Sequence, residues 1–123
     1  MLLQIEEKTI EPDIVLVELK GKLALGRESQ RLETLAADLV KAGRTKVILD
    51  MTGVDYIDSA GIGILALISG KMTEAGGALA VVAPEGRVLH LLNMTQMVRI
   101  LAVSPTVAEA LANLGETFPP AAA

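Results

Sequence analysis

Residues 46–72 of this chain, KVILDMTGVDYIDSAGIGILALISGKM, hold its most informative pattern. A short apolar run at 47–49 is typical of a buried strand. The polar segment 51–57 follows this run and is predicted to be a loop. Asp58 and Ser59 then precede an apolar helical segment. Either residue can therefore be the helix N-cap, where a side-chain oxygen accepts hydrogen bonds from free backbone N–H groups.

The rest of the chain alternates between strand and helix patterns. Apolar or alternating runs predict strands at 2–10, 13–23, 46–50, 78–83 and 100–103. Capping residues and apolar stripes at helical spacing predict four helices: 27–42, a helix from 59 onward, 84–93 with Pro84 first, and one from Ser104 and Pro105 to a stop at Gly115. The predicted order is β-β-α-β-α-β-α-β-α.

This order predicts a single α/β domain at 1–117, with 118–123 as a flexible C-terminal tail. Apolar strands that alternate with helices favour a mostly parallel sheet, and the first two strands are close enough in sequence to form an antiparallel edge hairpin. We therefore expect a mixed, mostly parallel sheet packed by about four helices. Apolar residues at both odd and even positions over 14–17 indicate that the second strand is buried on both faces.

Composition and charge exclude several classes of function. The chain is 51% apolar but only 2% aromatic, and Tyr56 and Phe118 are its only aromatic residues. It therefore has no platform on which the bases of single-stranded nucleic acid could stack. A formal net charge of −4 also argues against nucleic-acid binding. The absence of cysteine removes disulfides, thiol catalysis and thiolate metal sites.

The sequence also lacks the patterns of secreted and membrane proteins. The N-terminus has neither the basic flank nor the long apolar core of a signal peptide. The most apolar segment, 62–68, is too short to span a bilayer, which takes about 20 residues. We therefore expect a cytoplasmic protein without membrane insertion.

The helix after Ser59 is apolar nearly all round in its first turns, although a helix that covers a sheet needs only one apolar stripe. Either a neighbouring helix buries its second face, or that face binds a partner protein. Gly61 and Gly63 each lower helix stability by ~1 kcal/mol relative to alanine. Two such residues in one helix indicate that another group approaches it closely.

Enzymatic and cofactor sites fit the sequence poorly. A hydrolase nucleophile elbow at Ser59 would need glycine in place of Ile57, and His90 is the only histidine. The run GIGILA at 61–66 matches a GxGxxA dinucleotide motif, but the predicted loop separates it from the strand, and nearby aspartates would repel a pyrophosphate. No EF-hand spacing is present. We therefore predict no catalytic residue, no metal and no cofactor, and keep nucleotide binding as a remote alternative.

Ser59 is better explained as a modification site. A phosphate there would add roughly −1.5 to −2 charges at a helix N-terminus, where the helix dipole and free N–H groups tolerate it. Asp55 and Asp58 would make the patch still more negative, so an apolar partner surface would be repelled. Such a switch changes binding and leaves the fold intact.

Residues 49–63, LDMTGVDYIDSAGIG, resemble the signature of STAS domains, the family of anti-sigma factor antagonists. The resemblance covers nearly the whole chain, from the first hairpin to the terminal helix. It implies a mixed sheet with helices, and binding rather than catalysis. In this family the unphosphorylated protein binds an anti-sigma factor that is also a serine kinase. That kinase phosphorylates the serine matching Ser59, which breaks the complex, and a phosphatase restores the binding form.

The resemblance also implies a partner-binding surface around this serine. The matching positions beside it, or on the helix that partners contact, are Asp58, Ala60, Gly61, Ile62, Gly63 and Ile64. The family often has Gly-x-Leu-Asp where the second strand ends, with the aspartate at the partner surface. This chain has Ala24 at that position, so Ala24 is expected at the surface without the acid.

An alternative follows from the same resemblance. Related STAS domains act in stress-signalling assemblies and as accessory subunits of membrane transporters. The chain could therefore be an adaptor in which Ser59 is only a helix cap. The Asp58–Ser59 pair favours the phosphorylation switch, whereas Ala24 counts against it. The sequence leaves the oligomeric state open.

Overall fold

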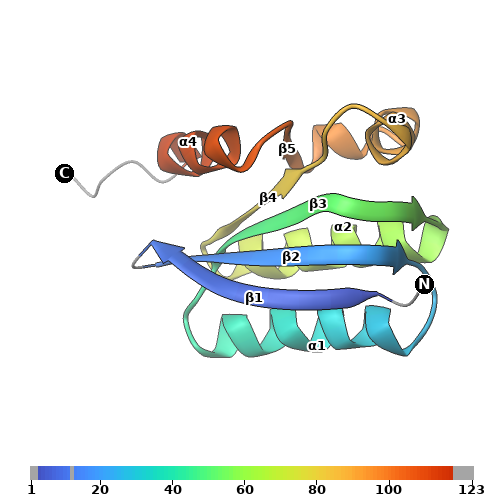
Figure 1. The fold of residues 1–123 in the computed structure, drawn as a ribbon. Helices are drawn as coiled ribbons and strands as arrows, with labels where there is room; N and C mark the ends of the chain where they lie inside the picture. Colours follow the sequence, from blue (N-terminus) through green and yellow to red (C-terminus); the bar gives the residue numbers. More distant parts are fainter. Residues whose placement is uncertain (1–2, 12, 118–123) are drawn as a thin grey trace.

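A computed structural model describes residues 3–11 and 13–117, so the predicted tail at 118–123 lies outside the described residues. Figure 1 shows the elements in chain order. They are β1 (Gln4–Glu11), β2 (Ile14–Leu23), α1 (Arg27–Lys41), β3 (Lys46–Ile57), α2 (Ser59–Glu74), β4 (Ala78–Val82), α3 (Arg87–Met94), the 3₁₀-helix η1 (Met97–Arg99), β5 (Ala102–Ser104) and α4 (Val107–Thr117). The predicted order of strands and helices is confirmed, with η1 added.

The sheet has five strands in the order β1-β2-β3-β4-β5. β1 and β2 pair antiparallel, and every other neighbouring pair is parallel. This arrangement confirms the predicted mixed sheet with an antiparallel N-terminal edge. Parallel neighbours require crossover connections, and α1, α2 and α3 with η1 supply them.

The helices form two layers that bury the two faces of the sheet. Figure 1 shows α1 and α2 side by side on one face and α4 on the other. Val15 and Val17 of β2 belong to the larger hydrophobic cluster with α1, α2 and α3, whereas Leu16 belongs to a second cluster with α4. The prediction that β2 is buried on both faces is therefore confirmed.

The predicted loop at 51–57 is wrong, because β3 continues through these residues. Met51, Val54 and Ile57 are buried at intervals of three residues rather than two. Register shifts in the β2–β3 pairing, at 18–20 and 21–22, account for this spacing. Such irregularities disrupt the period-two alternation by which a strand is read from sequence.

The starts of the last two helices also differ from prediction. α3 begins at Arg87 rather than Pro84, because Ala83 still donates its N–H to the Ser104 carbonyl and extends the strand pairing. Ser104 lies in β5 and is buried, so it does not cap α4. Thr106 takes that place: its Oγ1 accepts the N–H of Glu109 at 3.2 Å. α4 then runs through the predicted stop at Gly115 to Thr117.

Candidate partner-binding site

The N-terminus of α2 is capped by Asp58 and not by Ser59. Asp58 has an extended backbone, and its Oδ1 accepts the N–H of Gly61 at 2.9 Å. Ser59 is the first helical residue and is exposed. Its hydroxyl makes no hydrogen bond to any residue that the structure describes. Of the two candidates, Asp58 is therefore the cap, and the hydroxyl of Ser59 is accessible to solvent.

The same end of α2 packs closely on the last residue of β2, where the β2–α1 loop begins. A Cβ at Gly61 would lie 2.2 Å from the carbonyl oxygen of Leu23, so only glycine fits there. The N–H of Asp58 donates to the same carbonyl at 3.4 Å. Gly63 differs, because it is exposed and a Cβ there would meet nothing within 4 Å. The predicted close approach is therefore confirmed at Gly61 and wrong at Gly63 within the described chain.

Ala24 is brought to the same end of the molecule as the predicted phospho-acceptor. The next residue, Leu25, donates its N–H to Asp58 Oδ2 at 3.4 Å. The Ala24 carbonyl accepts a hydrogen bond from the Ser29 hydroxyl, which is buried. The Asp58 carboxylate thus links the β2–α1 loop to the first turn of α2.

The other predicted site residues lie along the first two turns of α2. Ala60, Ile62 and Ile64 are half-buried, and the two isoleucines pack against the larger cluster. Around the helix circumference, Leu65 lies between these two isoleucines and is fully buried. Neighbouring elements therefore cover most of the second apolar face, and Leu67, 42% exposed, is the large apolar residue that they leave open on α2.

Two apolar side chains near this end were not predicted from the sequence as site residues. Leu25 is 82% exposed and Tyr56 is 43% exposed. Lys22 places its Nζ 5.8 Å from the centre of the Tyr56 ring, which is within the range of a cation–π contact. A leucine immediately before a glycine, in the loop after a strand, is the sequence signal that could have identified Leu25.

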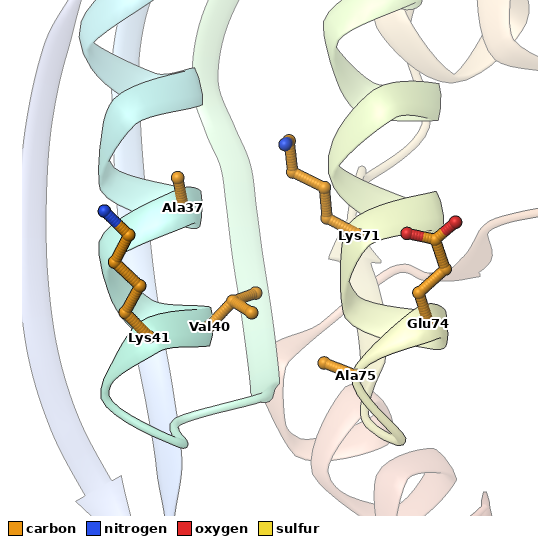
Figure 2. Close-up of a pocket in the computed structure, with 6 residues that line it drawn as sticks. All are labelled: Ala37, Val40, Lys41, Lys71, Glu74 and Ala75. Atoms are coloured by element: carbon orange, nitrogen blue, oxygen red, sulfur yellow. The ribbon is translucent and has the colours of Figure 1, made fainter.

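The opposite end of α2 borders a groove shared with α1. This groove has a volume of about 390 Å³. Figure 2 shows its lining residues, with the small side chains between the two helices; they are Ala37, Val40, Lys41, Lys71, Glu74 and Ala75. The groove holds none of the predicted site residues.

The geometry also bears on the nucleotide alternative. Because β3 reaches Ile57 and α2 begins at Ser59, no loop separates the strand from the glycine motif, and that part of the argument against a nucleotide was wrong. The space beside Gly61 is nevertheless filled by the carbonyl of Leu23, and the Gly61 N–H is bonded to a carboxylate. A pyrophosphate would have to displace both.

The described residues form neither a metal-binding cluster nor a membrane-spanning helix. Among residues 3–10 and 13–114, whose side chains the structure describes, no group of three or more His, Asp or Glu side chains could hold a metal ion. Among the helices that the structure describes, none is long and apolar enough to cross a membrane.

Comparison with known proteins places the chain in a family. The STAS domain model matches residues 7–110. The chain therefore belongs to the STAS domain family. A protein of Thermotoga neapolitana named as an anti-sigma factor antagonist is 32% identical over 74 residues, or 60% of this chain. The match spans 66% of that relative, just under two thirds of its length.

Solved structures share the fold over most of the chain. A Thermotoga maritima protein that is named as an anti-sigma factor antagonist has a TM-score of 0.81 at 25% identity, covering 89% of this chain and 93% of that one. The Bacillus cell-fate determinant SpoIIAA in its phosphorylated form has a TM-score of 0.70 at 14% identity, covering 89% and 98%. A sulfate transporter family protein from Wolinella succinogenes has a TM-score of 0.75 at 22% identity, covering 89% and 90%. The last two matches, below 25% identity, speak to fold alone.

Proposed function

We propose that this chain is a cytoplasmic anti-sigma factor antagonist, a binding protein rather than an enzyme. In this proposal the N-terminal end of α2 and the β2–α1 loop bind an anti-sigma factor with serine kinase activity. Phosphorylation of Ser59 by that kinase breaks the complex, and a phosphatase restores it. The observation that carries the proposal is that Asp58 caps α2, whereas Ser59, the first residue of the helix, is exposed and not needed for the cap.

Because Asp58 and not Ser59 makes the cap, a phosphate on Ser59 can change binding without unfolding the helix. A phosphoserine at position 59 adds roughly −1.5 to −2 charges at pH 7. The positive end of the α2 dipole tolerates that charge, and the Asp58 cap does not depend on the serine hydroxyl. Asp55 is exposed nearby in sequence and adds to the negative potential. A partner surface that excludes water from this patch would then bury unpaired negative charge, which is strongly unfavourable.

Relatives support the same role. The Thermotoga neapolitana relative is named as an anti-sigma factor antagonist, and SpoIIAA, which shares the fold, has been solved in a phosphorylated form. The position of Ser59 at an exposed helix start is what phosphorylation by a second protein requires.

The test is affinity capture from the cytoplasm of the source organism with four baits. They are the wild type, Ser59→Ala, Ser59→Asp and a control, Ala108→Asp. Ala108 is exposed near the start of α4, on the opposite face of the sheet, so the control adds the same charge at another helix N-terminus. We expect a kinase-like protein with every bait except Ser59→Asp. Phosphorylation of the wild type by that protein with ATP, and its absence in Ser59→Ala, identifies the acceptor.

The adaptor alternative predicts a different result. In that alternative Ser59 is only a helix cap, but Asp58 makes the cap, so the adaptor alternative now rests on the family resemblance and on Ala24. The fold that the chain shares with the sulfate transporter family protein is compatible with an adaptor role. If all four baits retain one and the same partner, the adaptor role replaces the switch. The nucleotide alternative is tested by thermal shift, where we expect no stabilisation by millimolar nucleotide.

A further inference from the structure

Leu25 is the most exposed large apolar side chain in the part of the chain that the structure describes, at 82%. It lies in the loop between β2 and α1, one residue after Ala24. A single exposed leucine is ordinary on a protein surface and needs no explanation by itself. The contacts around Leu25 distinguish it from a leucine on a freely moving loop.

Leu23, the last residue of β2, and the two loop residues that follow it are each held by a separate contact. The Leu23 carbonyl accepts the N–H of Asp58 at 3.4 Å and occupies the space where Gly61 lacks a side chain. The Ala24 carbonyl accepts the hydroxyl of Ser29. The Leu25 N–H donates to Asp58 Oδ2 at 3.4 Å. The backbone is therefore fixed up to and including the residue that carries the exposed leucine side chain.

An exposed apolar side chain on an ordered backbone is suited to binding. Ordering a loop upon association lowers affinity, so a residue that is already ordered in the free protein gives more net binding energy. Residues of this kind become anchors when a partner supplies a pocket that excludes water. The neighbouring Ala24 has no charge, so burying this loop does not require the desolvation of an acid at position 24.

We propose that Leu25 is the apolar anchor of the docking surface and that Asp58 positions it; this inference rests on the proposed function. The partner of the chain presents an apolar pocket to Leu25, rather than a basic group that would pair with an acid at position 24. Asp58 is bonded both to the loop and to the first turn of α2, so the anchor and Ser59 are held beside the same carboxylate. A phosphate on Ser59 therefore introduces charge at the edge of the pocket that receives Leu25.

The first test measures the affinity of the kinase captured by the wild-type bait, purified, for four variants. We expect Leu25→Ala to weaken binding by about tenfold or more, which is the range of an interface anchor. Met94→Ala is the matched control, because Met94 is 66% exposed but lies on α3. We expect this control to change the affinity by less than about twofold. Ser59→Asp is the reference for complete loss, and Asp58→Asn tests the positioning role.

The second test measures the exchange of the Leu25 amide proton by NMR in the free protein. Asparagine at position 58 can still accept the Gly61 N–H through its remaining oxygen, but its amide nitrogen cannot accept the Leu25 N–H. We expect faster exchange at Leu25 in Asp58→Asn, little change at Gly61, and weaker binding of the kinase. Equal exchange at Leu25 in both proteins would overturn the positioning role.

The outcomes separate this inference from the proposed function. If Leu25→Ala binds like the wild type while Ser59→Asp does not bind, the anchor is wrong and the switch stands. If the wild type captures no kinase from the cytoplasm, the proposed function fails and the anchor fails with it. A loss of binding in Leu25→Ala but not in Met94→Ala, with the melting temperature unchanged, supports the anchor.

Discussion

The two ends of α2 are held in different ways. At the N-terminal end, Gly61 packs against a backbone carbonyl and Asp58 satisfies a backbone N–H. At the C-terminal end, small side chains leave a groove of about 390 Å³ between α1 and α2, and Lys41 and Lys71 border it (Figure 2). Backbone contacts have few alternative geometries, whereas long cationic side chains have many. The contacts at the end that carries the predicted phospho-acceptor therefore have less conformational freedom than the side chains that border the groove.

The largest expected effect separates the two glycines of the first turns. Gly61→Ala places a methyl group 2.2 Å from the Leu23 carbonyl, which forces the helix and loop apart. We expect roughly 3 kcal/mol lower stability to denaturant, the upper range for overpacking. Gly63→Ala meets nothing within 4 Å and should raise stability by about 0.5–1 kcal/mol through helix propensity. Equal effects of the two substitutions would remove the contrast between a packed and an open turn.

A smaller effect separates the cap from the serine beside it. Asp58→Ala removes the acceptor of the Gly61 and Leu25 N–H groups, and we expect a loss of about 1 kcal/mol in the free energy of unfolding. Ser59→Ala removes an exposed hydroxyl without a described partner and should change stability by less than about 0.5 kcal/mol. Urea denaturation of both variants measures the difference. A cost at Ser59 as large as that at Asp58 would mean that the serine has a structural role.

Much of the fold could be predicted because its signals are local. The alternation of apolar strands with helices determines the mixed sheet, and the apolar positions of both parities in β2 predicted two covered faces. The residues 51–57 could not be assigned to a strand from their pattern. Their buried residues repeat every third position because of irregular pairing with β2, and that pairing depends on residues far away in the sequence.

The local geometry of the candidate site could be predicted in part, because some of its signals are also local. Asp58 and Ser59 carry a local capping signal, so the start of the helix was predicted correctly. Which of the two residues is the cap depends on the backbone geometry. Gly61 and Gly63 are indistinguishable in sequence, and only the packing of the β2–α1 loop separates them. The hydrogen bond from Leu25 to Asp58 joins residues 33 positions apart, so no local pattern could reveal it.

The smallest expected effect concerns the other end of α2. Lys71 is the basic residue of its last turn, where a positive charge interacts favourably with the helix dipole. Lys71→Gln should therefore lower stability by about 0.5 kcal/mol at low ionic strength, and this loss should vanish near 1 M salt. The cost of Asp58→Ala should persist in salt for the most part, because it includes lost hydrogen bonds as well as charge. Denaturation of both variants at low and high salt tests whether electrostatics stabilise the C-terminal end of α2 and backbone contacts its N-terminal end. A loss of stability in Lys71→Gln that is independent of salt would show that the packing of Lys71 in the groove matters more than its charge.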